Sequence, residues 1–382
     1  MKGFQNVSAY IGGKIITCDI LFDERIQAVG KGKGAYEKLT LPEGALVLPG
    51  FIDEHIHGAG GADTMDGTGS ALSVMASALA KEGTTSFLAT TMTQSKENIL
   101  RALGAVKEYR SAQHKKGARL AGVHLEGPFI AEAHKGAQPA EYIAKPEVEI
   151  FEAYNLASGN CIKIVTLAPE KEGAAELVKY LTARGVIASI GHTSAKYADI
   201  EKAVHSGATH VTHTFNAQSP LHHREIGTVG SALLMDELIC ELIADTIHVS
   251  VPAMKLLVRS KGEKVILITD AIRAKGLGDG ESELGGQKVY VKNGEARLED
   301  GTLAGSVLRM NIALKNIVEK VGVPLESAIK FATENPAHAL GIYRETGSIE
   351  VGKRADFAVL DKEFNVLMTV RDGEVIYRAE GV

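Results

Sequence analysis

The chain has 382 residues, of which 45% are hydrophobic and 23% charged, and its formal net charge is −5. This composition is ordinary for a globular protein, and the acidic balance gives no electrostatic reason to expect nucleic-acid or anionic-membrane binding. No apolar run approaches the ~20 residues that span a bilayer, and the first residues lack the apolar core of a signal peptide. The three cysteines (Cys18, Cys161 and Cys240) form no CxxC pair, so we expect reduced thiols and a cytoplasmic protein.

Short alternating apolar runs at both ends of the chain predict β-strands. Gly12 and Gly13 form a candidate hairpin turn near the N-terminus, and Asp372 with Gly373 separates two strand-like runs near the C-terminus. We therefore expect residues 1–48 and 345–382 to build one small β-sandwich domain together.

Between these ends, apolar β-rich runs alternate with helical patterns. Helical spacing of apolar residues separates most of the runs, as in "SALSVMASALA". Eight strand–helix units predict a (β/α)8 TIM-type barrel over residues 49–344. An open doubly wound sheet is the alternative, but no GxGxxG motif follows the first run. The predicted strands cover residues 46–57, 84–91, 119–127, 162–169, 186–192, 209–216, 238–245 and 264–271.

Polar residues stand at the carboxyl ends of these predicted strands, where barrel enzymes build their sites. A set of histidines and carboxylates without a thiolate suits a catalytic Zn²⁺, Fe²⁺ or Mn²⁺ rather than a structural site. For any one of these histidines alone, a hydrogen-bonded core residue is the simpler interpretation. The strand-end residues are His55, His57, Glu126, His192, His213, Asp245, His248 and Asp270.

The remaining histidines and one aspartate are expected to support the fold or face solvent. Asp53 has inward parity below the His55–His57 pair, and His124 lies one layer below Glu126, so we expect both to support the site. The alternation of His210 differs from that of His213, which favours a structural role. Solvent-facing positions are expected for His114, His134, His205 and His338.

Several motifs resemble those of one enzyme family over almost the whole chain. They are "LPGFIDEHIHG", "GVHLEGPF", "IGHTSA", "VTHTFNA", "IADTIHVS", "LITDAIRAKG" and "GTLAGS". In combination they are similar to the N-acetylglucosamine-6-phosphate deacetylases of the amidohydrolase superfamily. The resemblance implies a metal-dependent barrel that hydrolyses the acetamide of N-acetyl-D-glucosamine 6-phosphate, giving glucosamine 6-phosphate and acetate.

The resemblance also implies roles for individual residues. Glu126, His192 and His213 would hold the principal divalent ion, Zn or Fe, and Asp270 would be the catalytic acid/base. Because His55 and His57 are present, a second ion bridged through Glu126 is plausible. Thr246 and Gln218 stand where the family often has Gly and Met. Sugar-phosphate contacts are implied for Ala137, Asn216, Ala217, Arg224, His248, Leu303, Ala304 and Gly305.

The substrate's phosphate requires cations, and the loop "AQSPLHHREIG" offers His223 and Arg224. This loop is long enough for Arg224 to reach the site of a neighbouring subunit, and we expect a homodimer or a higher homo-oligomer. Three alternatives stay open: deacetylation of the galactosamine epimer, hydrolysis of a cyclic amide, and non-catalytic binding of a sugar phosphate. Enzymes for cyclic amides typically carry a carboxylated lysine at the end of strand four, whereas Lys163 lies at the start of that strand.

Overall fold

The computed structural model describes residues 1–31, 35–112 and 114–382. Eight parallel strands form the wall of the large domain, in the order β15-β14-β13-β12-β11-β10-β9-β6. The backbone N–H of Asp270, just after β15, donates to the carbonyl of His55 on β6 at 2.8 Å, which brings the two ends of the sheet together. The predicted TIM-type barrel is confirmed. Its strands are β6 (Phe51–Ile56), β9 (Thr84–Thr91), β10 (Arg119–Glu126), β11 (Ile162–Leu167), β12 (Ile187–Ile190), β13 (His210–Val211), β14 (Ile239–Ile243) and β15 (Val265–Ile268).

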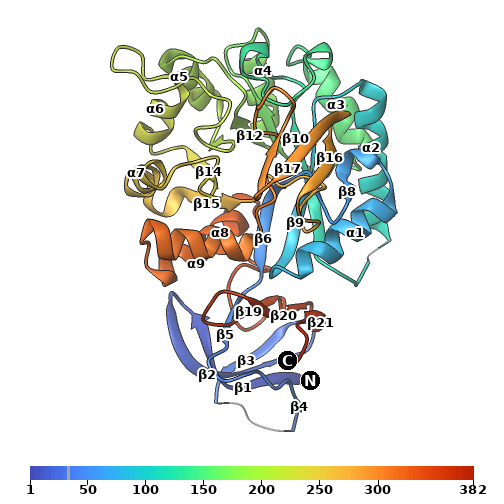
Figure 1. The fold of residues 1–382 in the computed structure, drawn as a ribbon, viewed down its shortest axis with the longest axis vertical. Helices are drawn as coiled ribbons and strands as arrows, with labels where there is room; N and C mark the ends of the chain where they lie inside the picture. Colours follow the sequence, from blue (N-terminus) through green and yellow to red (C-terminus); the bar gives the residue numbers. More distant parts are fainter. Residues whose placement is uncertain (32–34, 113) are drawn as a thin grey trace.

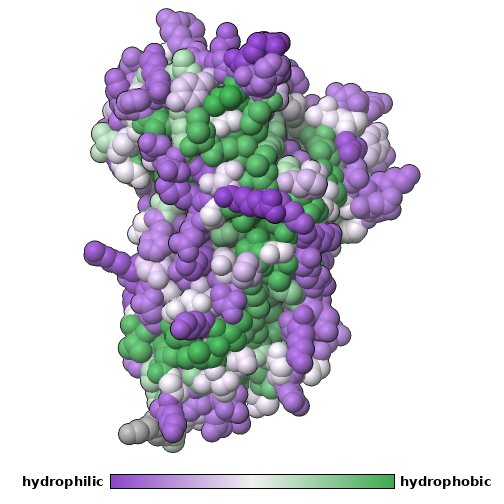
Figure 2. Space-filling model, turned by 90° about the vertical axis from the view of Figure 1, so that its left-hand side faces the viewer, coloured by the Kyte–Doolittle hydropathy of each residue, from purple (hydrophilic) through white to green (hydrophobic). Residues whose placement is uncertain are grey.

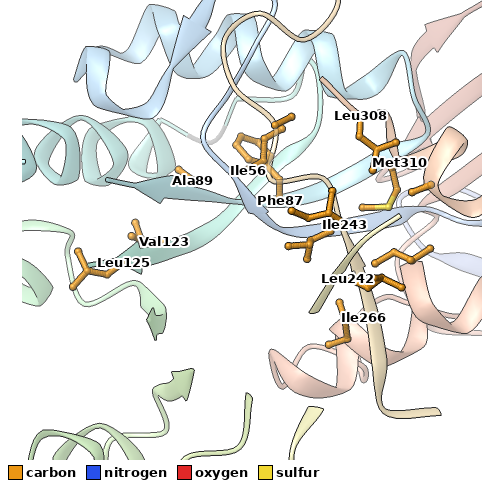
Figure 3. Packing of buried hydrophobic residues seen from close by; sticks show 14 of the residues in the cluster. Ile56, Phe87, Ala89, Val123, Leu125, Leu242, Ile243, Ile266, Leu308 and Met310 are labelled. Carbon is orange, nitrogen blue, oxygen red and sulfur yellow. The ribbon is translucent and has the colours of Figure 1, made fainter. Parts of the chain in front are cut away.

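Helices surround the barrel and cover the outward faces of its strands (Figure 1). The predicted apolar face of α1 is buried at Leu72, Met75 and Leu79. Figure 3 shows part of the resulting core, where Leu242 and Ile266 come from neighbouring strands. The helices are α1 (Gly69–Ala80), α2 (Lys96–Ser111), α3 (Val148–Ala157), α4 (Ala174–Ala183), α5 (Tyr197–Ser206), α6 (Gly227–Leu234), α7 (Val251–Lys261), α8 (Met310–Asn316), α9 (Leu325–Ala332) and α10 (Glu334–Ala339). Shorter helical turns are η1 (Thr64–Asp66), η2 (Glu132–His134), η3 (Ala140–Tyr142), η4 (Gly262–Lys264) and η5 (Ile317–Val321).

Both ends of the chain meet in a second, mostly antiparallel sheet below the barrel (Figure 1), as predicted. Its core includes the rings of Phe4, Phe22 and Phe357, whose centroids lie 5.0–5.6 Å apart. The predicted limits of the domains stay a prediction. The strands are β1 (Lys2–Ile11), β2 (Lys14–Phe22), β3 (Ile26–Gly30), β4 (Glu37–Lys38), β5 (Leu46–Pro49), β19 (Phe357–Leu360), β20 (Val366–Arg371) and β21 (Glu374–Arg378).

Two predicted strands differ from the structure. The run 46–57 is divided, because β5 pairs in the terminal sheet while β6 pairs in the barrel. Gly50 lies between them, and a Cβ there would stand 2.2 Å from Oγ1 of Thr85, so only glycine fits. The run 209–216 is a strand only at His210–Val211, because the chain leaves the extended conformation after it.

A three-stranded antiparallel sheet follows β15 and was not predicted. It consists of β16 (Gly280–Leu284), β17 (Gln287–Lys292) and β18 (Glu295–Arg297), and a small ribbon of β7 (Gly58–Ala59) and β8 (Ala62–Asp63) follows β6. The side chain of Gln287 donates to the carbonyl of Ala137 and thereby ties this sheet to the loop after β10. The inserted sheet consequently borders the carboxyl end of the barrel.

Ion pairs connect the amino-terminal end of the barrel to the terminal sheet. Arg119, at the start of β10, contacts Asp356 at 3.1 Å and Asp372 at 2.5 Å. Thr369 of β20 donates to the carbonyl of Ala80 at 2.7 Å. The terminal sheet is therefore attached at the amino-terminal end of the barrel, opposite to the carboxyl ends of the strands, which carry the predicted site residues. Among the described helices, none combines the length and apolar character needed to cross a bilayer.

Candidate active site

A cavity of about 330 Å³ opens at the carboxyl end of the barrel, and most of the predicted site residues line it. His55 and Ala304 are fully buried and do not line it, although Nε2 of His55 lies 3.3 Å from Oε1 of Glu126. His223 and Arg224 are exposed on the loop after β13 and do not line the cavity. The predicted residues that do line it are His57, Glu126, Ala137, His192, His213, Asn216, Ala217, His248, Asp270, Leu303 and Gly305.

Glu126 occupies the centre of a cluster of four imidazoles. Its Oε1 lies 3.1 Å from Nε2 of His213 and 3.3 Å from Nε2 of both His192 and His55. Its Oε2 lies 3.2 Å from Nε2 of His57. All of these residues come from the ends of different barrel strands or, for His55 and His57, from one strand with two-residue spacing. His55 and His57 therefore point the same way, as alternate side chains of a strand do.

Asp270 contacts two imidazoles of the same cluster. Its Oδ1 lies 3.2 Å from Nε2 of His57 and 3.4 Å from Nε2 of His55. Among the described residues, three groups of three have donor atoms within 4.8 Å of one another, and one of them, formed by His55, His124 and Glu241, contributes no residue to the cavity lining. We call Glu126, His192 and His213 the first trio, and His55, His57 and Asp270 the second trio.

The outer nitrogens of two imidazoles indicate that the cluster suits a metal ion. Nδ1 of His192 donates to the carbonyl of His134 at 2.8 Å, and Nδ1 of His55 donates to the carboxylate of Glu241 at 3.0 Å. In a neutral ring the proton then sits on Nδ1, and Nε2 offers its lone pair to the centre. Two such rings beside two carboxylates are a typical donor set for a divalent ion.

The pKa shifts indicate that the centre of the cluster favours a positive charge. Burial raises the pKa of Glu126, but the His55 charge and hydrogen bonds from His192 and His213 outweigh it and bring the pKa well below its usual value. The pKa of Asp270 falls to about 2 in the same way, because His55 and His57 outweigh its burial. Burial lowers the pKa of His57, but hydrogen bonds to Asp270 and Glu126 raise it to about 10. Both carboxylates are therefore ionised at neutral pH.

Backbone strain is concentrated at the same residues. His192, His213 and Asp270 have φ values of 47°, 30° and 47°, in the left-handed region that residues other than glycine rarely adopt. Each such residue costs of order 1–3 kcal/mol, and this kind of strain clusters at functional sites. The turn after each strand thus points a functional side chain into the cavity at some cost in stability.

The supporting residues behave largely as expected. Asp245 accepts from Nδ1 of His248 at 2.6 Å, which leaves Nε2 as the free nitrogen of this cavity-lining ring. Both nitrogens of His124 are engaged, one with the carbonyl of Glu54 and one with Thr166, so it is no ligand. Asp53 accepts from Oγ1 of Thr269 at 2.6 Å and supports the turn before Asp270.

Three residues that contact the cluster were not predicted to do so. His134 was expected to face solvent, but it lines the cavity and its carbonyl accepts from Nδ1 of His192. Gln138 donates to Oε2 of Glu126 at 2.7 Å, and nothing in the local sequence pointed to it. Glu241 contacts His55 and His213 from inside β14. A signal for Glu241 was present, since a carboxylate inside the apolar run "ICELI" is unusual and requires a partner.

Comparisons with known proteins agree with this geometry. The model of the Amidohydrolase family matches residues 46–376. The N-acetylglucosamine-6-phosphate deacetylase of Bacillus subtilis is 45% identical over 361 residues, which cover 93% of this chain and 91% of the relative. The N-acetylgalactosamine-6-phosphate deacetylase of Escherichia coli O157:H7 is 37% identical and covers 86% of this chain and 87% of its own.

A solved structure shows the same fold. It is a variant of the N-acetyl-D-glucosamine-6-phosphate deacetylase of Mycobacterium smegmatis in complex with N-acetyl-D-glucosamine-6-phosphate. Its TM-score is 0.90 at 31% identity, and the match covers 98% of this chain and 99% of that one. The chain belongs to the amidohydrolase family and, within it, to the N-acetylglucosamine-6-phosphate deacetylases.

Proposed function

We propose that the chain hydrolyses the acetamide of N-acetyl-D-glucosamine 6-phosphate to glucosamine 6-phosphate and acetate. The observation that carries this proposal is Asp270 beside the imidazole cluster at the base of the cavity, in a chain 45% identical to a deacetylase of that name. A volume of about 330 Å³ is at the lower end of small-molecule sites, which suits a single sugar.

A divalent ion, Zn or Fe, fits the donor set. The first trio would hold the principal ion, and His55 and His57 with Glu126 would hold a second. When bound, such an ion polarises a carbonyl oxygen and makes water acidic enough to ionise near neutral pH.

Asp270 performs the proton transfers in this mechanism. Its carboxylate is ionised, so it takes a proton from the attacking water while the new C–O bond forms. It then delivers this proton to the amide nitrogen, because the nitrogen must leave as an amine when the C–N bond breaks. No Ser or Cys is among the described residues that line the cavity, which supports direct attack by water.

His248 stabilises the oxyanion that develops on the acetyl carbonyl. Burial lowers the pKa of His248, but the hydrogen bond to Asp245 outweighs it and raises the pKa. The raised pKa keeps a proton on Nε2 up to a higher pH than in a free imidazole, and the position of the ring in the cavity lining suits donation to a carbonyl oxygen.

The phosphate of the substrate requires a cation from outside the cavity lining. Among the described lining residues there is no Lys or Arg. Arg224 is the proposed contact, with His223 beside it, since Nη1 of Arg224 lies 2.8 Å from Nε2 of His223. Arg224 would contact a phosphate bound either in its own subunit or in the site of a second copy.

The apolar area on the face shown in Figure 2 supports association into a homo-oligomer. The unpaired, buried thiols of Cys18, Cys161 and Cys240 support a cytoplasmic location.

The test is acetate release from the 6-phosphates of N-acetylglucosamine and N-acetylgalactosamine, with metal content measured on the same sample. We expect faster turnover of the glucosamine compound and at least one ion per chain. Faster turnover of the galactosamine compound would favour the epimer-specific alternative, and no acetate from either would contradict the proposal. Arg224→Ala should lower kcat/KM for the phosphorylated sugar about 10–150-fold. It should barely change the slow turnover of the unphosphorylated sugar.

A further inference from the structure

Glu241 is a buried carboxylate that touches both halves of the metal cluster. It lies in β14 and is fully buried. Its Oε2 accepts from Nδ1 of His55 at 3.0 Å and from the backbone N–H of His213 at 3.1 Å. One oxygen atom therefore contacts a member of the second trio and a member of the first.

The contact with His55 determines which nitrogen of the ring faces the cluster. A carboxylate only accepts, so Nδ1 carries the proton and Nε2 points to Glu126 and Asp270 at 3.3 and 3.4 Å. Such outer hydrogen bonds orient metal-binding histidines and raise their basicity.

The contact with His213 acts on the backbone. His213 has a φ of 30°, and a residue in such a conformation persists only where its surroundings hold it. The N–H of His213 points to Glu241, and its ring then places Nε2 3.1 Å from Oε1 of Glu126. Loss of the acceptor would leave this buried N–H unpaired and release the turn.

The charge of Glu241 has no compensation outside the cluster. Among the described residues, the ion pairs of Glu241 involve His55 at 3.0 Å and His124 at 3.9 Å, and no Lys or Arg pairs with it. Burial lowers the pKa of His124 to about 4, so this second ring is neutral. Its Oε1 is buried without a hydrogen-bond partner. A carboxylate that is buried without a Lys or Arg partner contributes little to the stability of the fold. Its negative charge does, however, favour a cation in the cluster.

We propose that Glu241 is the positioning residue of the metal site, aligning His55 and His213 through one carboxylate oxygen. This inference rests on the proposed function in so far as the cluster binds a divalent ion. It assigns a role to a residue that does not line the cavity, and it links the geometry of the two trios.

The experiment compares Glu241→Met, which removes the acceptor at similar volume, with Glu241→Gln, which keeps an acceptor but removes the charge. Thr166→Val is the matched control, because the buried hydroxyl of Thr166 bonds His124 and Thr212 and, among the described residues, forms no hydrogen bond with a side chain of either trio. Bound Zn²⁺ per chain is measured by elemental analysis over a series of buffered free Zn²⁺ concentrations. Histidine ¹⁵N NMR of the same samples reports which nitrogen of His55 carries the proton.

We expect a 10–100-fold weaker Zn²⁺ affinity for Glu241→Gln, in the range found for outer-shell partners, and a larger loss for Glu241→Met. His55 should lose its fixed Nδ1–H form in Glu241→Met, while Thr166→Val should match the unmodified chain. Unchanged Zn²⁺ affinity in both Glu241 variants would overturn the proposal. If Glu241→Met fails to fold, Glu241→Gln alone decides the matter. Failure of the proposed function would show separately, as normal Zn²⁺ binding without acetate release from the unmodified chain.

Discussion

The carboxyl end of the barrel and the terminal sheet differ in where the backbone is strained and in the kind of side chain that they bury. At the barrel end, His192, His213 and Asp270 are strained and ionisable groups are buried together. In the terminal sheet, the positive φ values of Asn6, Phe364 and Asp372 lie at a register shift or in turns between strands, as do those of Gly12, Gly13 and Gly373, and the core is built from aromatic and aliphatic side chains. The comparison teaches that one region gives up stability for chemistry while the other supplies stability without contacting the site.

The largest expected effect comes from Asp270→Asn at the barrel end. The amide keeps the shape of the side chain but can neither take nor deliver the proton, so kcat should fall at least 10²–10⁴-fold. The ion held by the first trio should remain, as measured by metal content. Near-normal kcat would show that Asp270 is only a structural part of the cluster.

Phe357→Ala tests the other side of the comparison. The ring is fully buried against Phe4 and Phe22, so the free energy of unfolding should fall by about 3–5 kcal/mol. Below the unfolding transition kcat/KM should stay unchanged, because the terminal sheet lies at the far end of the barrel. Denaturant unfolding and steady-state kinetics on one preparation measure both quantities. A folded variant with reduced kcat/KM would show that the terminal sheet contributes to catalysis as well as to stability.

The same contrast explains what could be predicted from the sequence. Strand parity and barrel topology placed His55, His57, Glu126 and Asp270 together, because period-two alternation and the meeting of strand ends are local rules. The conformation after β13 was not predictable in this way. His213 and the residues after it leave the strand through positive φ values, which arise from tertiary contacts such as that with Glu241.

Other differences had signals in the sequence. The inserted sheet turns at Gly285–Gly286 and at Asn293–Gly294, both of which are recognised hairpin dipeptides. They stand in a polar segment without the nearly continuous apolar runs of the barrel strands, which is why they were overlooked. The position of Arg224 relative to the cavity depends on a long loop, and no local pattern determines how such a loop folds.

The comparison extends to acid stability, because the terminal segments 1–48 and 345–382 contain no histidine. In the barrel, burial lowers the pKa of His210 from 6.5 to about 4. Between these values the unfolded chain binds a proton that the folded chain does not, so this group makes stability fall as pH drops from about 6.5 to 4. Its largest contribution to the slope is about 1.4 kcal/mol per pH unit.

His210→Gln should therefore flatten the dependence of the unfolding free energy on pH in this window. His205→Gln, at an exposed position of α5, is the matched control and should leave the slope as it is. Denaturant unfolding at several pH values between 4 and 7 provides the measurement. Equal slopes in both variants would mean that His210 takes up its proton in the folded chain as readily as in the unfolded one.

The smallest expected effect is a gain in stability at Thr246, on the loop between Asp245 and His248. Thr246 has a φ of 70°, which is unfavourable for a β-branched residue. Thr246→Gly removes strain of roughly 1–3 kcal/mol, and the greater freedom of glycine in the unfolded chain offsets roughly 0.5–1 kcal/mol of this. The N–H groups of Ile247 and His248, both 2.8 Å from Oδ1 of Asp245, should hold the loop in place. A small rise in Tm with unchanged kcat is therefore expected from calorimetry and kinetics.

Thr246→Ala is the control: it keeps a Cβ, so its Tm should rise less than that of Thr246→Gly. A lower Tm for the glycine variant would show that the side chain of Thr246 stabilises the loop. Strain at this barrel end would then extend no further than the imidazole cluster.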